Sequence, residues 1–226
     1  IKIMSESPSV NKDRVLTCSV YCNGNKLGNE YTLVAATVHL ELNRIGKATL
    51  KFNAGNTNKQ TFDESDADLF KPGNAIRLEV GDIEKENILF DGMIIGLRII
   101  TDKDFHSYML VECRDHAYSA TQGRKNRIFE KKKDCDIIKE VLSAYGSVEV
   151  DSTPYQYPTL VQYYCSDWDF ALSRADANGL FIFTDGGKIK VKKPDVSTSP
   201  VLTVTYGVDL TTFDLELSAD DQFTQY

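Results

Sequence analysis

The chain has 226 residues, of which 42% are hydrophobic and 26% charged, and a net charge of -7. This composition predicts a water-soluble globular protein with a buried core, and the negative charge argues against non-specific nucleic-acid binding. No apolar run approaches the ~20 residues that a membrane-spanning helix needs, so we expect no stable membrane insertion. The chain begins at Ile1 rather than Met, so we expect a fragment or a trimmed terminus, and its first residues are too polar for a secretory signal.

The first half of the chain alternates β-rich runs with turn signals. We expect strands at residues 14–21, 31–42, 47–52, 75–80, 88–100 and 105–114. Turns are predicted at Asn23-Gly24, at residues 43–46 and at Pro72-Gly73. Gly92 and Gly96 lie inside the longest run and indicate a bent strand, which favours a barrel because closing a sheet requires corners.

Cysteine and histidine form no pattern typical of a metal site or a disulfide framework. The five cysteines are an odd number, and Cys18 and Cys22 are followed by no second close pair. His39 alternates with Val38 and Leu40, so we expect it on the solvent face of a strand rather than as a ligand. We predict free thiols, no metal ion and no cofactor.

A basic run follows the predicted barrel. Its six cations are Arg124, Lys125, Arg127, Lys131, Lys132 and Lys133. Nucleic-acid binding by this run would require interleaved aromatic residues, and Phe129 is the only one present. We interpret the run as a solvated loop, and an electrostatic contact with an acidic partner subunit stays open.

Two helices are predicted after the basic run. Asp134 is expected to cap the first, which has an apolar face and ends at Gly146. A strand at 160–164 leads to Ser166, which with Asp169 predicts a capped second helix ending at Gly179. Strands at 180–183 and 188–193 then flank a turn at 185–187, and further strands are expected at 201–206 and 211–217.

Residues 160–183 resemble the signature of VgrG spike proteins of type VI secretion, a fold shared with the baseplate hub proteins of contractile-tailed phages. The matching residues are Val161, Gln162, Tyr163, Asp167, Asp169, Phe170, Ser173, Arg174, Asn178, Gly179 and Phe181. A second match precedes it at Arg127, Ile128, Phe129, Asp136, Ile137, Ile138, Val141 and Leu142. Weaker matches come earlier, at Asn43, Ile45, Ala48, Phe70, Pro72, Gly73, Phe90, Gly92 and Ile94. The tryptophan-rich pattern of the family is missing at residues 111–118, which indicates a distant branch.

The resemblance implies a mainly β fold with an α/β insertion (α+β). It predicts a first β-barrel domain at residues 1–121 and an α/β segment with two helices and a hairpin at 122–195. Residues 196–226 would hold the opening strands of a second, similar barrel.

The resemblance also implies a structural hub or spike subunit of a contractile injection apparatus. The expected assembly is a homotrimer that adapts a sixfold tube to a threefold spike. Its expected partners are the tube protein, spike tip, baseplate subunits and effector cargo. The protein would be cytoplasmic during assembly and then ejected with the spike.

No motif of an enzyme is present, and we predict no catalytic residue, no cofactor-binding residue and no nucleic-acid partner. Asp167 and Asp169 are two residues apart at a helix start, where capping explains them without chemistry. Arg114, Asp115 and His116 alternate faces on a strand and are not expected to meet one substrate. Two alternatives stay open: another phage tail-tip component, or a surface- or carbohydrate-binding β module. The β module would use the tyrosines Tyr155, Tyr157, Tyr163 and Tyr164.

Overall fold

The structure is a computed structural model. It describes residues 17–55, 68–81, 85–103, 106–195, 197–200, 202–207, 210 and 212–216. The chain divides into two compact units, Leu16–Pro194 and a second unit that combines Ile1–Val15 with Asp195–Tyr226. No helix among the described residues is both long and apolar enough to cross a membrane.

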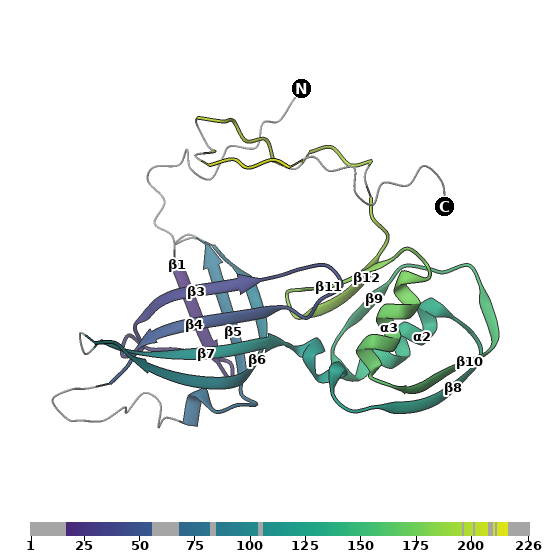
Figure 1. Cartoon of the computed structure of the whole chain (residues 1–226), viewed down its shortest axis with the longest axis horizontal. Coiled ribbons are helices and arrows are strands. Elements are labelled where there is room, and N and C mark those ends of the chain that lie inside the picture. The colour runs from purple at the N-terminus through teal and green to yellow at the C-terminus, as the bar shows by residue number, and fades with distance from the viewer. Residues whose placement is uncertain are drawn as a thin grey trace. The chain divides into compact units, whose positions relative to one another are not determined.

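Seven strands of the larger unit form one antiparallel sheet (Figure 1). They are β1 (Thr17–Cys22), β2 (Asn25–Lys26), β3 (Leu33–His39), β4 (Lys47–Asn53), β5 (Ala75–Gly81), β6 (Glu86–Thr101) and β7 (Ser107–Asp115). Their order in the sheet is β2-β1-β5-β6-β7-β4-β3. The mostly β fold with a few helices confirms the predicted α+β class. We name the seven-stranded sheet the barrel sheet, because it lies where the first barrel was predicted.

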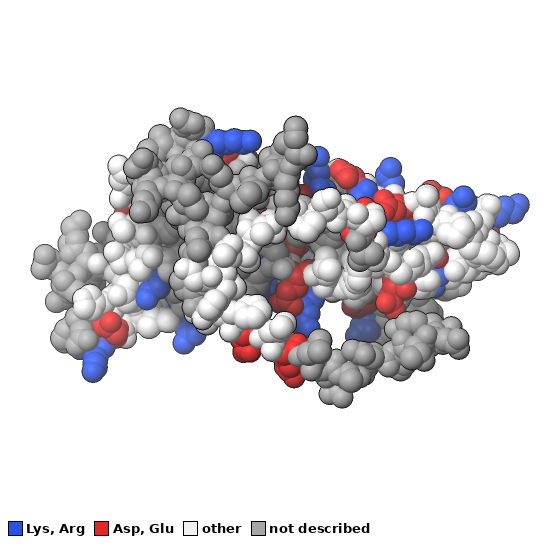
Figure 2. Space-filling view, turned by 90° about the horizontal axis from the view of Figure 1, so that it is seen from above, with Lys and Arg blue, Asp and Glu red and all other residues white. Residues whose placement is uncertain are grey.

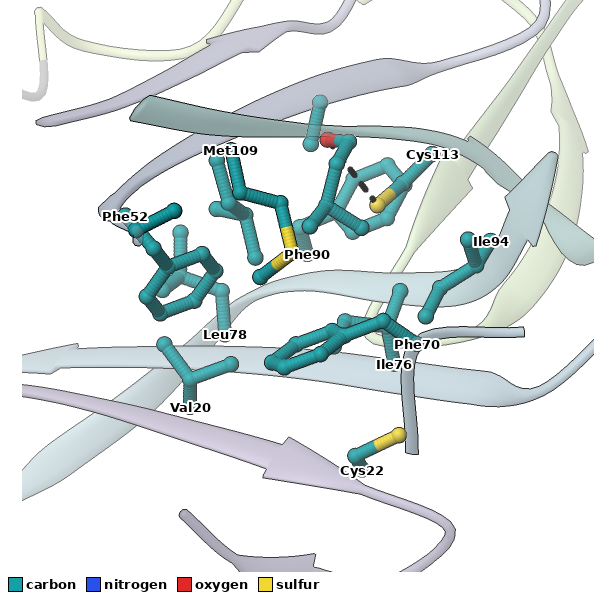
Figure 3. Close-up of a cluster of buried hydrophobic side chains, with 14 residues drawn as sticks. Val20, Cys22, Phe52, Phe70, Ile76, Leu78, Phe90, Ile94, Met109 and Cys113 are labelled. Atoms are coloured by element: carbon teal, nitrogen blue, oxygen red, sulfur yellow. Dashed lines mark hydrogen bonds between the residues drawn. The ribbon is translucent and has the colours of Figure 1, made fainter. Parts of the chain in front are cut away.

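The barrel sheet encloses one apolar core (Figure 3). Along β4, Ala48, Leu50 and Phe52 are buried while the residues between them face outward, as the alternation of the sequence predicts. Phe70, from a short 3-10 helix η1 (Asp68–Phe70), packs 5.3 Å from the rings of both Tyr31 and Phe52. This helix therefore closes the core from the side.

The bend predicted in the longest strand is present in β6. Its pairing with β7 shifts register between Ile94 and Gly96, which is a β-bulge. At Gly92 a Cβ atom would lie 2.1 Å from the carbonyl oxygen of Arg114, so only glycine allows the two strands to approach this closely. The predicted tight turns are also present, with left-handed φ angles of 48° at Asn23, 82° at Gly24 and 98° at Gly73.

The strand predicted at 31–42 is shorter in the structure. It ends at His39, which is exposed as expected, and Leu40 and Leu42 are 50% and 55% exposed instead of facing the core. The cause is Asn43, whose backbone N–H donates to the carbonyl oxygen of Ile182 at 2.7 Å. Its side-chain oxygen accepts the N–H of Ile182 at 2.9 Å. The loop therefore leaves the barrel sheet to pair with a strand of the α/β part.

The α/β part follows a second 3-10 helix, η2 (His116–Thr121). It contains β8 (Lys125–Lys133), α2 (Asp134–Leu142), η3 (Ser143–Tyr145), β9 (Val148–Val150), β10 (Gln156–Cys165), α3 (Asp167–Asp176), β11 (Phe181–Asp185) and β12 (Lys188–Lys192). A three-stranded sheet has the order β11-β12-β9, and β8 and β10 form a separate two-stranded ribbon. Two left-handed glycines, Gly186 and Gly187, make the predicted turn between β11 and β12.

The basic run is a strand and not the predicted solvated loop. Residues of β8 pair antiparallel with β10, and Phe129 is buried beneath the ribbon against Phe170 of α3. The sequence prediction was wrong because the charges of Lys125 and Arg127 are neutralised by Asp167, a partner 40 residues or more further along the chain.

The smaller unit does not contain the two strands predicted at 201–206 and 211–217, as far as its described residues go. Tyr206 and Leu210 form one isolated bridge, and residues 202–207 and 212–216 otherwise pair with no strand. A pair of strands is marginally stable in water without a third strand or a packed face. The second barrel that these residues were expected to open stays a prediction.

Candidate assembly surfaces

The second helix of the α/β part begins and ends where the sequence predicts. The hydroxyl oxygen of Ser166 accepts the backbone N–H of Asp169 at 3.1 Å, and the hydroxyl donates to the Asp169 carboxylate at 2.6 Å. At the other end Gly179 adopts a left-handed φ of 62°. The N–H of Leu180 then bonds back to the carbonyl oxygen of Ala175 at 2.9 Å.

Asp167 is a buried anchor and not the helix cap that the sequence indicated. Its side chain is 0% exposed. One carboxylate oxygen accepts hydrogen bonds from Lys125 at 2.6 Å and from the Tyr145 hydroxyl at 2.7 Å, and the other accepts from Gln162 at 2.9 Å. Burial alone would raise the pKa of Asp167, but the bonds from Gln162, Lys125 and Tyr145 hold it below its ordinary value.

Asp134 likewise does not cap its helix. The capping position of α2 is Lys133, which makes no side-chain capping bond, and Asp134 is the first helical residue. Its carboxylate accepts two hydrogen bonds from the Arg174 guanidinium, at 2.6 and 3.0 Å, and this bidentate ion pair joins α2 to α3. Asn178 donates to the same carboxylate at 2.8 Å. Burial opposes ionisation of Asp134, yet the bonds from Arg174 and Asn178 lower its pKa.

These two carboxylate networks join elements that are distant in sequence. The Asp167 network connects α3 to the β8–β10 ribbon and to η3. The Asp134 network connects α2 to α3, and Arg174 extends it to β10 by donating to the Tyr157 hydroxyl at 2.7 Å. Asp167, Arg174 and Asn178 therefore hold the ribbon against the helices, which explains these motif residues by structure rather than by chemistry.

Asp115 and His116, which follow Arg114, bond to different partners. Asp115 is buried and accepts the N–H of Ala117 at 2.8 Å and the Thr184 hydroxyl at 3.0 Å, and its burial raises its pKa. His116 instead lies 3.3 Å from Asp91, a hydrogen bond that raises the pKa of His116. Asp115 thus links the end of the barrel sheet to β11.

The four tyrosines of the alternative binding-module interpretation do not form one platform. Tyr155 and Tyr157 pack edge to face with centroids 4.7 Å apart. Tyr163 lies six residues along the same strand from Tyr157, about 20 Å away at ~3.3 Å per residue. The structure therefore gives a sugar ring no continuous aromatic surface across these residues.

One edge of the barrel sheet is exposed and uncharged. β3 is the last strand in the order, and its residues from Leu33 to Val38 carry no charge. Ala36 pairs with the buried Leu50 and so faces the interior, yet Ala36 is exposed. A groove of about 500 Å³ lies beside Leu33, lined also by Val20 and Leu27 of the opposite end of the sheet. Such an edge is typical of a site that pairs with another chain.

The β8–β10 ribbon carries a second exposed surface, which we name the ribbon patch: Ile128, Val161 and Tyr163. Ile128 and Val161 are directly paired across the strands and are 67% and 51% exposed. Tyr163 is two residues beyond Val161, on the same face, and 80% exposed. The sequence prediction missed this surface because the basic run was interpreted as a loop. The alternation of Ile128 with Arg127 and Phe129 was the available signal.

The described part of the chain holds no group of three or more histidine, cysteine, aspartate or glutamate side chains placed to bind a metal ion. The five cysteines are free thiols, and Cys22 and Cys113 are buried in the barrel core.

Comparison with known proteins identifies a family. The sequence model of the Alg8 N-terminal domain matches residues 12–226. The chain belongs to the Alg8 N-terminal domain family. The matched family is therefore a different one from the VgrG proteins that the sequence motifs resemble. No curated protein sequence matches the chain.

Solved structures place this Alg8 N-terminal domain in a known fold. A 43 kDa tail protein of prophage MuSo2 from Shewanella oneidensis superimposes with a TM-score of 0.63 at 12% identity, covering 79% of this chain and 53% of its own. A tail protein from Neisseria meningitidis gives 0.61 at 14% identity, covering 82% and 53%. A type VI secretion component from E. coli, described as similar to T4 bacteriophage tail proteins, gives 0.56 at 14% identity, covering 76% and 48%. The chain thus has the fold of phage-tail and type VI secretion proteins and spans about half the length of these three structures.

Proposed function

We propose that the chain is a structural hub or spike subunit of a contractile injection apparatus, related to VgrG proteins and contractile phage tails. The observation that carries this proposal is the shared fold, which extends over about four-fifths of the chain in tail proteins from two bacteria and in a type VI secretion component. The motif order along the sequence supports the same conclusion independently. Another phage tail-tip component belongs to the same class of function.

The proposed assembly is a homotrimeric ring. Each subunit would contribute two similar barrels, so that three subunits present six modules to a sixfold tube while supporting a threefold spike. The exposed, uncharged edge of β3 supports this proposal because a ring contact would cover it. The protein would assemble in the cytoplasm and be ejected with the spike, in contact with tube, spike-tip and baseplate subunits and with effector cargo.

The proposed role is not enzymatic. The most buried carboxylates of the α/β part, Asp134 and Asp167, are engaged by cations and by amide or hydroxyl donors on both of their oxygens. Lowered pKa values keep both ionised, which suits a structural ion pair and not an acid catalyst.

Electron microscopy of the purified chain at high concentration tests this proposal. We expect closed particles with threefold symmetry around a central opening. Particles of a single subunit, or open filaments without closure, would contradict the ring. Adding a purified tube protein of a contractile injection apparatus should produce stacks in which the ring sits at the end of a tube.

A further inference from the structure

The outer face of the β8–β10 ribbon carries an exposed apolar pair, Ile128 and Val161, with the exposed Glu130 two residues from Ile128 on the same face. The inner face of the ribbon is used, since Phe129 and Leu160 pack on the helices and Arg127 reaches Asp167. The ribbon patch on the outer face stays exposed at 67%, 51% and 80% for Ile128, Val161 and Tyr163. Exposed apolar residues are common when scattered, but a cross-strand pair continued by a tyrosine is a contiguous surface of the kind found at interfaces.

Two strained residues flank the ribbon patch. Lys131 on β8 has a φ of 51° and Tyr164 on β10 a φ of 45°, a left-handed backbone that bulky residues rarely adopt. Both are exposed, and β10 shifts its register beside Tyr164. Hydrogen bonds inside the chain hold both backbones: the carbonyl oxygen of Lys131 accepts from Gln156 at 2.6 Å, and the N–H of Tyr164 donates to Asn126 at 2.9 Å. Backbone strain that is held in this way is frequent at contact sites.

The charge around the ribbon patch is opposite to that of the rest of the chain. Residues 122–133 contain six basic residues and one acidic residue, a net charge of +5. Because the whole chain has a net charge of -7, the remaining residues together carry -12. Lys125 and Arg127 are compensated by Asp167, and Lys132 by Glu140. Arg124, Lys131 and Lys133 are exposed and form no ion pair with any residue that the structure describes. Figure 2 shows lysine and arginine side chains at the end of the molecule where Figure 1 draws the ribbon, with aspartate or glutamate side chains among them.

We infer that the ribbon patch, together with the exposed cations Arg124, Lys131 and Lys133 of the same stretch of chain, binds the acidic surface of a second copy of this chain. A basic patch on a chain that is elsewhere strongly acidic favours head-to-tail contact between copies, in which unlike surfaces meet. Such a contact repeats around a ring, with the apolar centre excluding water and the cations setting the orientation. This inference rests on the proposed ring and names one of its contacts.

Sedimentation velocity across a wide concentration range tests the inference on the intact chain. Ile128→Asp places a charge in the apolar centre and should raise the dissociation constant of self-association by about tenfold or more. Ile88→Asp is the matched control, because Ile88 is also an exposed β-strand isoleucine, at 40%, and lies on the barrel sheet. It should leave association unchanged.

A charge series adds a second readout. The double variant Lys131→Glu with Lys133→Glu should weaken association and remove most of its dependence on salt. Lys103→Glu with Lys188→Glu makes the same change in net charge at two exposed lysines, one after β6 and one on β12, and should not weaken it. Circular dichroism of each variant confirms that it is folded.

Three outcomes are distinct. Loss of association in the ribbon variants alone supports the inference. A trimer that survives Ile128→Asp and the lysine reversal overturns the inference and leaves the proposed function intact. A wild-type chain that stays monomeric at every concentration contradicts the proposed ring, and the inference is lost with it.

Discussion

The buried cluster of the barrel sheet contains apolar and cysteine side chains, with the buried Asp115 at the end of β7, whereas the α/β part buries Asp134 and Asp167, each paired with a cation. The barrel sheet is stabilised by removing apolar surface from water, a contribution that does not depend on pH. The α/β part adds two ion-pair networks, which depend on the protonation of carboxylates and on exact partners. The two regions should therefore respond differently to mutation and to acid.

Truncation in the barrel core should give the largest effect. Phe70→Ala removes a fully buried ring that contacts two others, and we expect a loss of about 3–5 kcal/mol in the free energy of unfolding. Urea unfolding followed by circular dichroism measures it. The control Val34→Ala, at a 47% exposed position, should change stability by less than about 0.5 kcal/mol. Equal effects of the two variants would show that η1 does not close the core.

Removing the charge of Asp167 should have the next largest effect. Asp167→Asn leaves the shape of the side chain but weakens its bonds to Lys125 and Tyr145, at a cost on the order of 2 kcal/mol. Fluorescence of Trp168, the single tryptophan and a buried residue of α3, reports on this region during urea unfolding. Asp169→Asn is the control; it affects only a cap and should cost about 1 kcal/mol or less. The reverse order would restore the capping interpretation of Asp167.

Acid should unfold the α/β part before the barrel sheet. The folded-state pKa values of Asp134 and Asp167 are lowered, so their stabilisation is present above the unfolded value of about 3.9 and is lost as the pH falls below it. Trp168 fluorescence should change at a higher pH than the β signal in circular dichroism. In the Asp167→Asn variant this early change should be smaller. Coincident transitions in the wild-type chain would refute the difference between the regions.

The smallest effect is expected at the end of α3. Gly179 has a φ of 62° and open space where a Cβ would stand, so Gly179→Ala should cost only the backbone strain, about 1 kcal/mol. Gly96→Ala is the matched glycine without a positive φ, and its Cβ would meet Glu112 at an ordinary 3.9 Å. Thermal unfolding should place the Gly179 variant below the Gly96 variant. Identical midpoints would contradict the left-handed assignment.

The difference between the barrel sheet and the α/β part also explains which features could be predicted from the sequence. Alternation, turn glycines and the Ser166–Asp169 cap are local signals, and they located the barrel strands, the bend in β6 and both helices. The anchoring of Asp167 by Lys125, 42 residues away, and of Asp134 by Arg174, 40 residues away, depends on tertiary structure. Local reasoning therefore assigned these carboxylates to capping and the basic run to a loop. The ribbon patch was missed for the same reason, since its pairing of Ile128 with Val161 is also non-local.

The solution mass of the purified chain is the measurement that decides whether it forms a trimer. Light scattering across a wide concentration range should give the mass of a trimer, about three times the 25.4 kDa of one chain, or a monomer–trimer equilibrium that moves toward trimer with concentration. A constant mass of one chain at the highest concentration would contradict the proposed homotrimer.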